Sequence, residues 1–536
     1  MKHKSALDKS DKTTTALLAL LSFCVGAANV IAFAPMALWP VQIISVAVLF
    51  YLLSANSMTP GRAALLSFSF SLGWLSAAVS WLTIAMTRFG NLPWWLAILA
   101  LLLLCGFLST YYGICAYLAQ RFFARESAQV KSWWYLLLVL PAFWEIAEAL
   151  RVYLFTGFPW AISGYAHTQS PLSGYAPVLG VLGIGWLNAV LAASLVWLLR
   201  SRSGRSRLGS LSLIASILIA GFSLKQVQWT VPEGQAIQVR LLQGNIAQDL
   251  KFQSDYLNHS LALYFDLLTK QAADLSVTPE TALPILSSQL PPDYLPALRQ
   301  FATQKQTTLM LGVAAHDGGS HYANSLLGMS ANYAQRDYRY DKSHLVPFGE
   351  FIPPGFDWFV KAMQIPMSDF TRPATLQAPL LVGQQAVQPN ICYEDLFGEE
   401  IARELRAQLK SQESGARAKV AGIMLNTSNL AWYGDSWAID QHLQISQMRA
   451  LEMQRPMLRA TNTGATAHIA HDGRVLARLP SNQAGVLTVS VQGRKGATPY
   501  IYYGNSSIAL IILSLLIIAG YWQRIGRSKK TKTSSR

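Results

Sequence analysis

Charged residues are scarce in this sequence of 536 residues, where Asp, Glu, Lys and Arg together account for 13%. Soluble globular proteins carry about 25% of such residues. Hydrophobic residues reach 52%, so the composition argues against a soluble protein and indicates an integral membrane protein. The length leaves room for a membrane part and for at least one sizeable folded domain.

Basic stretches with interleaved aromatic residues, which nucleic-acid-binding proteins use, are also lacking. The net charge is +15, yet residues 233–505 contain 22 Lys and Arg against 23 Asp and Glu. The rest of the chain contains 21 Lys and Arg against 5 Asp and Glu. The positive charge therefore lies beside the hydrophobic runs, where it reports membrane topology, and we expect no nucleic-acid partner.

Cysteine is rare. Cys24, Cys105 and Cys115 lie in hydrophobic runs, and only Cys392 lies in the polar segment 233–505. That segment therefore cannot form an internal disulfide, and an unpaired thiol outside the cytoplasm is unusual. The sequence has no cluster of Cys and His with the spacing of metal ligands, so we expect neither a metal ion nor another cofactor.

Eight hydrophobic runs approach the length of about 20 residues that a helix needs to cross a bilayer. They are residues 14–33, 39–54, 63–86, 94–118, 133–150, 178–199, 208–224 and 508–522. The first run follows a basic start, but no small-residue cleavage site with soluble sequence comes after it, so we expect a helix and not a signal peptide. The sequence thus predicts a transmembrane α-helical bundle of eight spans.

The loop charges predict the orientation of these spans, because cytoplasmic loops of membrane proteins are rich in Lys and Arg. With the N-terminus in the cytoplasm, 18 of the 21 basic residues outside 233–505 lie on the cytoplasmic side. We therefore expect a multi-pass membrane protein with both termini in the cytoplasm. Residues 1–232 would form seven helices with their loops, residues 233–505 a domain outside the cytoplasm, and residues 506–536 a last helix with a basic tail.

The segment 233–505 alternates between strand and helix patterns. Strands are expected at 237–242, 275–279, 308–315, 323–329, 384–391, 421–426, 456–461 and 485–491, with a hairpin at 466–478. Helices are expected at 256–273, 394–409 and 436–453. The repeated strand–helix–strand order predicts a layered α/β domain.

Cys392 lies where a predicted strand ends and a charged helix is expected to begin. A thiol at a helix N-terminus would be favoured as thiolate and hence as a nucleophile, although a small buried cysteine fits the same pattern. Such a nucleophile needs a base and a group that stabilises the oxyanion. A histidine could be the base, but none of those in the segment stands in a recognisable partner motif: His259, His316, His321, His344, His442, His468 and His471.

A carboxylate paired with a lysine is the other candidate. Glu280 ends a predicted strand within the run VTPETA, and Lys342 lies in the run YDKSHLVPFGE at residues 340–350. Each residue by itself has an ordinary interpretation, because Glu280 could cap a helix and Lys342 could be a solvated loop charge.

Together these motifs resemble the nitrilase superfamily: Pro-Glu at a strand end, the run from Lys342, and then Cys-Tyr-Glu at Cys392. Further matches lie at 243–245 (QGN), 426–429 (NTSN), 432–435 (WYGD) and 459–464 (RATNTG). Because hydrophobic spans frame this segment on both sides, the chain is similar to the apolipoprotein N-acyltransferase family. The spans, the loop around residues 157–160 and the C-terminal anchor fall where that family has them.

The resemblance implies that residues 233–505 form a nitrilase-like αββα sandwich, and it assigns three catalytic roles. Cys392 would be the nucleophile that forms a thioester. Glu280 would be the general base, and Lys342 would stabilise the negative oxygen of the tetrahedral intermediates.

The resemblance also covers the surroundings of these residues. Glu350 and Tyr393 match family positions that shape the site, and Glu394 matches a neighbour of the nucleophile. Two positions depart from the family pattern: Leu430 stands where an acidic residue is common, and Phe252 stands where a tryptophan is common. Both would affect the lining for substrates more than the chemistry.

The family implies transfer of the sn-1 acyl chain of a phospholipid, with phosphatidylethanolamine as the expected donor, to the α-amine of an N-terminal diacylglyceryl-cysteine on a lipoprotein. One alternative is a membrane-anchored nitrilase-like amidase that transfers acyl groups to water. Another is a non-catalytic membrane transporter or scaffold, since Glu145 and Glu148 lie in the fifth run and intramembrane carboxylates often mark transport paths. We favour a polar helix end near the outer surface, close to Arg151, for these two residues.

Overall fold

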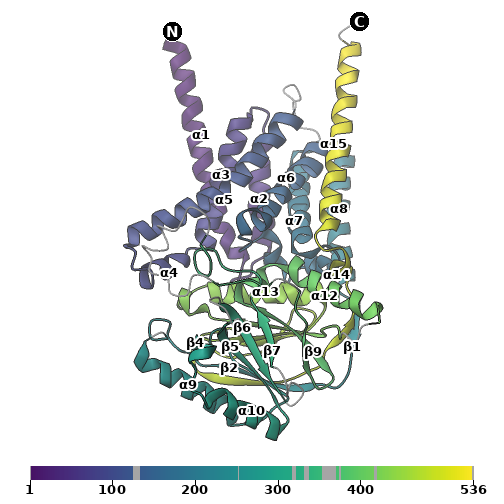
Figure 1. The fold of residues 1–536 in the computed structure, drawn as a ribbon. Coiled ribbons are helices and arrows are strands. Elements are labelled where there is room, and N and C mark those ends of the chain that lie inside the picture. The colour runs from purple at the N-terminus through teal and green to yellow at the C-terminus, as the bar shows by residue number, and fades with distance from the viewer. Residues whose placement is uncertain are drawn as a thin grey trace. The chain divides into compact units, whose positions relative to one another are not determined.

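The computed structural model describes residues 2–124, 133–251, 253–316, 322–330, 337–352, 370–373, 376–415 and 419–533. The chain forms two compact units (Figure 1). The helical unit comprises Met1–Ser80, Trp95–Val227 and Tyr503–Arg536, and the sheet unit comprises Trp81–Trp94 and Gln228–Tyr502. Both units are therefore assembled from segments that are far apart in the sequence.

Long helices make up the helical unit. They are α1 (Lys2–Ala28), α2 (Pro40–Leu53), α3 (Pro60–Ala78), α5 (Trp94–Phe123), α6 (Leu140–Tyr153), α7 (Ala176–Arg200), α8 (Gly204–Leu224) and α15 (Ser506–Thr533). Within the described residues, five helices are long and apolar enough to cross a membrane, or six if one bent pair counts as a single span. Several apolar helices are thus confirmed, whereas the number of eight spans stays a prediction.

Apolar side chains cover the outside of these helices as well as their inside. Leu103 is 66% exposed, Ile219 is 65% exposed and Leu510 is 65% exposed. Soluble proteins rarely expose apolar surface on this scale, because water would be in contact with it. The helices are suited to an environment of lipid.

The third expected span, residues 63–86, is not one continuous helix. The helix α3 ends at Ala78, and α4 (Leu82–Arg88) follows at an angle of 57°. Trp81 lies at this break and contacts other residues of the sheet unit. Its indole N–H donates to Oε1 of Gln441 at 3.1 Å, and its ring lies 4.3 Å from that of Tyr433. The expectation of an unbroken helix to residue 86 is therefore wrong.

Glu145 and Glu148 are buried in the helical unit, with exposed fractions of 2% and 0%. Oε1 of Glu148 accepts hydrogen bonds from the backbone N–H and the hydroxyl of Ser163, at 3.0 and 2.8 Å. The guanidinium group of Arg151 donates to the carbonyl oxygens of Phe158 and Trp160. This polar cluster fixes the loop that follows α6, so these carboxylates are more deeply enclosed than a polar helix end would be.

Two β-sheets form the centre of the sheet unit. One has the order β13-β12-β11-β10-β9-β8, and the other has the order β14-β2-β3-β5-β6-β7, with β4 beside β5. The first sheet consists of β8 (Leu380–Val382), β9 (Gln385–Ile391), β10 (Ile423–Ser428), β11 (Met457–Thr461), β12 (Ala467–Ile469) and β13 (Val475–Arg478). The second consists of β2 (Ile237–Gln243), β3 (Leu275–Val277), β4 (Leu283–Leu286), β5 (Thr308–His316), β6 (Tyr322–Met329), β7 (Tyr338–Asp341) and β14 (Gly485–Val491). A separate pair joins β1 (Thr230–Pro232) to β15 (Arg494–Gly496).

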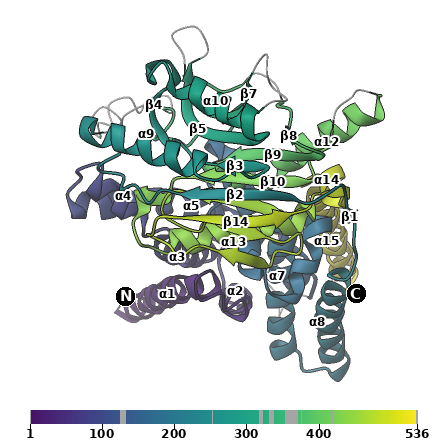
Figure 2. The same cartoon turned by 90° about the horizontal axis from the view of Figure 1, so that it is seen from below.

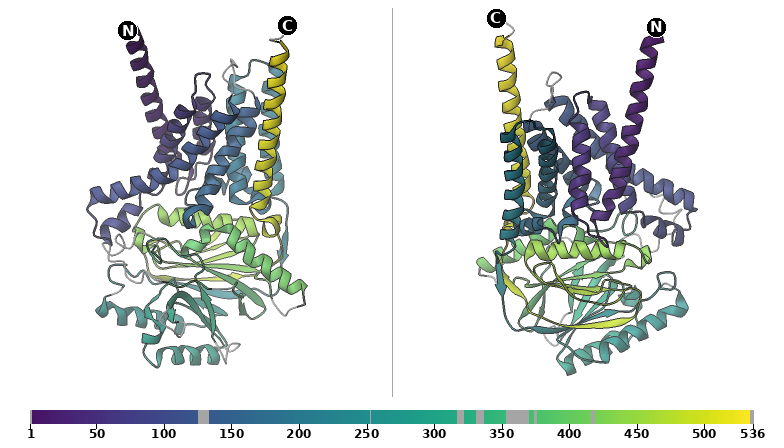
Figure 3. Two further views of the ribbon diagram at one scale, coloured as in Figure 1. Left: turned by 45° about the horizontal axis from the view of Figure 1, so that its top comes forward. Right: turned by 180° about the vertical axis from the view of Figure 1, so that it is seen from behind.

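Helices cover the outer face of each sheet, so the layers follow the order αββα. The helices α12 (Gly398–Glu413) and α13 (Ala438–Met453) lie on one side of the strands, and α9 (Ser254–Thr269) and α10 (Tyr294–Lys305) lie on the other (Figures 1 and 2). Figure 3 shows the same order of layers from two further directions. The nitrilase-like sandwich expected from the sequence is thereby confirmed.

Alternation along the strands explains this layering. Successive side chains of a strand point to opposite faces. In β10, Leu425 packs into the core between the two sheets, whereas the preceding Met424 packs with α12 and α13. In β11, Leu458 likewise packs between the two sheets, and Met457 packs with α12 and α13. Both faces of each strand are apolar because both are covered.

The parallel strands place the candidate site residues after their carboxyl ends. The strands β9, β10 and β11 are parallel to one another, as are β2, β3 and β5. Ligands in open α/β sheets bind outside the carboxyl ends of such strands. Cys392 directly follows β9, Asn429 directly follows β10, and Glu280 follows β3.

Most expected strands are found within one or two residues of their predicted bounds, as is the hairpin β12–β13. Two helices differ: the helix expected at 256–273 ends at Thr269, and the helix expected at 394–409 is preceded by a 3-10 turn, Cys392–Leu396, so that α12 begins only at Gly398. The short strands β4, β7 and β8 and the helix α10 were not expected. Short strands carry too few residues for a clear alternating pattern.

Candidate active site

Cys392 occupies a strained position at the end of β9. Its φ of 53° lies in the left-handed region, which is uncommon for residues other than glycine and clusters at active sites. Nδ2 of Asn426 donates to Oδ1 of Asn390 at 2.6 Å and to the carbonyl oxygen of Cys392 at 3.3 Å. The neighbouring strand thus holds the backbone of the cysteine in this conformation.

The thiol of Cys392 is half-buried against the edge of the core between the sheets. Burial, followed by the negative charges of Glu280 and Glu350, raises its pKa above the ordinary value, although Lys342 acts in the opposite direction. The resting group is therefore a thiol. The expectation that a helix N-terminus would favour the thiolate is wrong, because the cysteine begins a short 3-10 turn in a site with carboxylates.

Glu280 is positioned to take the proton of that thiol. Its Oε1 accepts hydrogen bonds from Nδ2 of Asn324 at 2.9 Å and from Nζ of Lys342 at 3.1 Å. Its Oε2 accepts one from the backbone N–H of Asn429 at 2.9 Å. Burial raises its pKa, but Lys342 and the hydrogen bond from Asn324 outweigh burial, so the pKa lies below the ordinary value. The group is an ionised carboxylate next to a protonated sulfur.

Lys342 supplies a buried ammonium group, with an exposed fraction of 1%. Its Nζ lies 2.8 Å from Oε1 of Glu350 and 3.1 Å from Oε1 of Glu280. Burial lowers the pKa of Lys342, but the two carboxylates outweigh it and hold the pKa well above the ordinary value. Because Oε2 of Glu350 also accepts from the backbone N–H of Val346 at 2.8 Å, Glu350 fixes Lys342 in place.

Glu394 links the two chain segments that carry Lys342 and Cys392. Its Oε1 accepts from the backbone N–H groups of Ser343 at 2.6 Å and His344 at 3.2 Å. Its Oε2 accepts from the backbone N–H of Ile391 at 2.6 Å. Burial raises the pKa of Glu394 to about 7, against the opposing effect of these hydrogen bonds. Glu394 positions the site.

Tyr393 belongs to a group of aromatic rings beside the nucleophile. Its ring lies 5.3 Å from that of Phe397 and 5.7 Å from that of His344. His344 stacks on Phe397 at 3.5 Å, and its Nδ1 lies 3.0 Å from Oε1 of Glu400. These rings form a rigid side of the site.

The structure adds residues that the sequence did not indicate. Asn324, on β6, donates to Glu350 at 2.8 Å as well as to Glu280. Lys251, in the loop after β2, is buried and donates to Oγ1 of Thr281 at 2.6 Å. An isolated lysine in a loop and an asparagine within a strand pattern carry no signal of their own, because only folding places them at the site.

Among the described histidines, His442 is the candidate for a base, because its ring interacts with the backbone of Cys392. Its Nδ1 lies 3.1 Å from a guanidinium nitrogen of Arg459. Burial and the charge of Arg459 hold its pKa well below the ordinary value. A ring in this state is a poor acceptor for the thiol proton, so the geometry favours Glu280 as the base. His321 lies outside the described residues.

An aromatic wall from a distant part of the chain completes the described site. The hydroxyl of Tyr433 lies within reach of the charges of Cys392 and Lys342. Burial and then the charge of Cys392 raise its pKa above the ordinary value, and Lys342 acts in the opposite direction. Trp81 packs edge-on against Tyr433, and Phe89 packs against Trp432 at 5.2 Å. The segment around α4 thus supports this wall.

Of the two positions that depart from the family pattern, the structure describes Leu430. Leu430 is 1% exposed and packs in the core under α12 and α13, so it is a structural residue. Phe252 lies outside the described residues.

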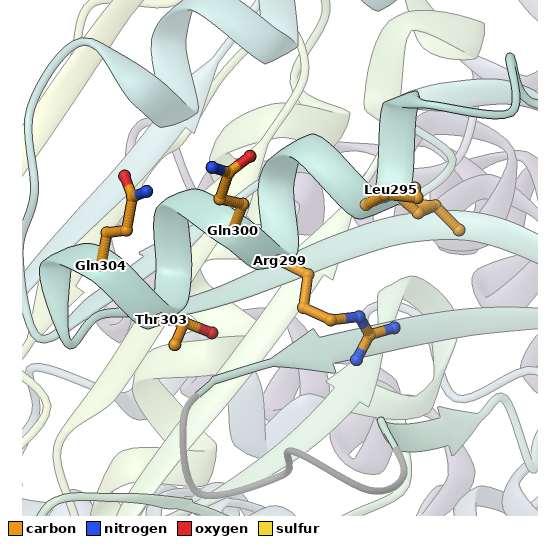
Figure 4. A pocket seen from close by; sticks show the side chains of 6 residues that line it. Leu295, Arg299, Gln300, Thr303 and Gln304 are labelled. Carbon is orange, nitrogen blue, oxygen red and sulfur yellow. The ribbon is translucent and has the colours of Figure 1, made fainter.

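A hollow of about 540 Å³ lies elsewhere in the sheet unit, along α10 (Figure 4). It is lined by Leu295, Pro296, Arg299, Gln300, Thr303 and Gln304. Its one charged residue, Arg299, is paired with Asp337 at 2.5 and 2.6 Å. This hollow contains none of the residues expected to be catalytic, and it offers no chemistry of its own.

The chain is similar to known proteins along nearly its whole length. Residues 25–194 match the family model of the apolipoprotein N-acyltransferase N-terminal domain, and residues 238–500 match that of carbon-nitrogen hydrolase. The chain is 44% identical to the apolipoprotein N-acyltransferase of Ralstonia nicotianae, with 94% of each chain covered. It is 40% identical to that of Nitrosomonas europaea, covering 96% of this chain and 98% of the relative. Among solved structures, a mutant amidase of the nitrilase superfamily from Nesterenkonia matches with a TM-score of 0.37 and 16% identity, covering 52% of this chain and 98% of the amidase.

Proposed function

Because the chain belongs to the apolipoprotein N-acyltransferase family, we propose that Cys392 carries an acyl group from a phospholipid to the α-amine of a lipoprotein. One observation supports this most directly: Nζ of Lys342 lies 3.1 Å from Oε1 of Glu280 and 2.8 Å from Oε1 of Glu350, and the charges of all three groups act on the thiol of Cys392. Nucleophile, base and cation therefore stand in one buried network. A thioester intermediate divides one difficult transfer into two easier steps.

The first step consumes the phospholipid. The thiol proton of Cys392 passes to Glu280 while the sulfur attacks the carbonyl carbon of the sn-1 ester. The carbonyl oxygen becomes an oxyanion, and Lys342 stabilises it electrostatically in a site that excludes water. The ester C–O bond then breaks, Glu280 returns the proton to the departing oxygen, and a lysophospholipid leaves.

The second step forms the amide. The neutral α-amine of the diacylglyceryl-cysteine attacks the thioester carbon, and Glu280 accepts a proton from the nitrogen. Lys342 again stabilises the oxyanion. The C–S bond breaks, and the proton held by Glu280 restores the thiol of Cys392.

The membrane arrangement supports the same proposal. The protein is integral to the bacterial inner membrane, and we propose eight spans with both termini in the cytoplasm and the sheet unit in the periplasm. The basis is the placement of 18 of the 21 basic residues outside residues 233–505 on one side. An enzyme anchored in the plane of its two lipid substrates meets them at high effective concentration. Phosphatidylethanolamine is the proposed donor.

The experiment is to trap the acyl group. Intact-mass measurement of the full chain, after incubation with phosphatidylethanolamine in detergent micelles, should show an acyl adduct that peptide mapping places on Cys392. Adding a diacylated lipopeptide with a free α-amine should discharge it. Cys392→Ala should give no adduct, whereas Cys24→Ala, which removes a thiol from α1, should behave as wild type.

Other outcomes would contradict the proposal. Full lipopeptide acylation by Cys392→Ala would contradict the role of Cys392, whereas a wild-type protein that forms no adduct and acylates no lipopeptide would be a non-catalytic scaffold. Release of free fatty acid, with no gain from added lipopeptide, would instead show an amidase that transfers acyl groups to water.

A further inference from the structure

Lys251 is a second buried ammonium group beside the nucleophile. Its exposed fraction is 2%, and its Nζ donates to Oγ1 of Thr281 at 2.6 Å. Thr281 directly follows Glu280 in the chain, and its φ of 45° lies in the left-handed region. A lysine on the loop after β2 therefore bonds to the residue next to the proposed base.

The loop that carries Lys251 is built into the site. Oε1 of Gln248 accepts a hydrogen bond from Nδ2 of Asn429 at 2.7 Å, and the backbone N–H of Asn429 donates to Glu280. The backbone N–H of Lys251 donates to the carbonyl oxygen of Ala247 at 3.1 Å, which closes a turn. The loop that carries Lys251 is thus linked to Asn429, which also donates to Glu280.

Charge explains why an ammonium group is found there. Burying a cation is costly unless opposite charge compensates for it, and the hydroxyl of Thr281 is neutral. Within the described part of the chain, the charge of Glu280 and then that of Cys392 act on Lys251. These are the two groups between which a proton moves in the first step of the proposed reaction. With Lys342, the site holds two ammonium groups against the carboxylates of Glu280 and Glu350.

We propose that Lys251 is a positioning residue of the acyl transfer, which holds Glu280 through Thr281 and offsets the negative charge that passes from Glu280 to Cys392. This inference rests on the proposed function. When the thiol gives its proton to Glu280, the negative charge moves to sulfur, and Lys251 faces both locations. Without it, the negative charge of Glu350 and the negative charge that Glu280 and Cys392 exchange would have only the ammonium group of Lys342 to offset them.

The proposal has a consequence for pH. Burial lowers the pKa of Lys251 to about 8, although Glu280 and then Cys392 act to raise it. The ammonium form is therefore lost as the pH rises through about 8. Formation of the acyl-enzyme should slow over the same range, because the compensating charge disappears. A guanidinium group at this position would keep its charge throughout.

The test measures the first step alone. Full-length protein in detergent micelles is mixed with phosphatidylglycerol, which has no amine that titrates near pH 8, and the initial rate of adduct formation is followed by intact mass from about pH 6 to about pH 9.5. The wild-type rate should fall above about pH 8. Lys251→Arg should form the adduct without that fall, and Lys251→Met should be slower by about tenfold at pH 7, with no fall.

Two further variants separate this role from a merely structural one. Thr281→Val removes the hydroxyl that Lys251 contacts but keeps the shape of the side chain, and it should slow adduct formation while retaining the fall. Lys270→Met removes an exposed ammonium group at the end of α9 and should match wild type in rate and pH profile. Thermal unfolding of each variant shows whether a loss of rate reflects a loss of fold.

The result that overturns the inference is a fall above about pH 8 that persists unchanged in Lys251→Arg, or a Lys251→Met variant with the rate and profile of wild type. Either result leaves the thioester mechanism intact. Absence of any adduct in the wild-type protein with phosphatidylethanolamine as well as with phosphatidylglycerol, by contrast, would overturn the proposed function itself.

Discussion

Glu280 and Glu350 accept hydrogen bonds from the same two donors. Nζ of Lys342 lies 3.1 Å from Oε1 of Glu280 and 2.8 Å from Oε1 of Glu350, and Nδ2 of Asn324 lies 2.9 and 2.8 Å from these same atoms. The base and the residue that positions the cation are therefore coupled. Groups held in advance in this way need not reorganise when charge develops in the transition state.

Replacement of the base should abolish the first step. Glu280→Gln keeps the size of the side chain but removes a carboxylate that can take the thiol proton, and general-base catalysis contributes about 100-fold or more. Adduct formation from phosphatidylethanolamine, followed by intact mass, should fall by at least that factor. Glu413→Gln, at the exposed end of α12, serves as the control. Adduct formation at the wild-type rate would refute the assignment of Glu280.

Replacement of the cation should reduce both activity and stability. Lys342→Met leaves Glu280 and Glu350 buried without their ammonium partner, and breaking a buried pair costs about 3–5 kcal/mol of unfolding free energy. Adduct formation should fall by about 100-fold or more, because the oxyanion loses its stabilising charge. Heating in detergent micelles should give a lower unfolding midpoint for this variant and an unchanged one for Lys305→Met, on α10. A variant with wild-type rate and midpoint would contradict the prediction.

The side-chain amide of Asn324, which Glu280 and Glu350 share, should set the pH below which adduct formation slows. Asn324→Leu removes one hydrogen bond from each of two carboxylates, so the pKa of Glu280 should rise toward its ordinary value. The acidic limb of adduct formation should then move to higher pH by about one unit. Initial rates between about pH 4 and about pH 7 check this. An acidic limb at the same pH as in wild type would show that Asn324 does not act on Glu280.

Glu394 should make the stability of the protein depend on pH. Its pKa of about 7 in the folded protein lies above the value of about 4.3 for an unfolded chain, so the folded state binds a proton that the unfolded state releases. That contribution to stability is complete below about pH 4 and is lost as the pH rises through about 7. The unfolding midpoint of wild type should therefore fall relative to that of Glu394→Gln over this range. A constant difference between the two proteins would contradict the shift.

Trp81 should support the site through Tyr433. Trp81→Ala removes the ring that packs against Tyr433 at 4.3 Å and the hydrogen bond to Gln441, which should loosen the aromatic wall. Small misplacements in an active site slow catalysis strongly, so adduct formation should fall by about tenfold. Trp81→Phe retains the ring contact and should keep most of the rate. Equal rates for the alanine and phenylalanine variants would argue against this support.

Local sequence patterns predict much of the architecture. The scarcity of charge and the apolar runs predicted a membrane protein, and the alternation of strand and helix patterns predicted a layered α/β domain. These predictions succeed because burial of one face leaves a period in the sequence. The spacing of Glu280, Lys342 and Cys392 suggested a family, and the family suggested their roles.

The tertiary structure alone decided the state and the surroundings of these residues. Burial and nearby carboxylates make Cys392 a resting thiol, although its place at the start of a predicted helix suggested a thiolate. Asn324 and Lys251 join the site from a strand and a loop with no distinctive pattern, and Trp81 lies at a break in an apolar run that predicted one helix. Protonation and pairing depend on groups that are distant in the chain and adjacent in space, and no local pattern records that adjacency.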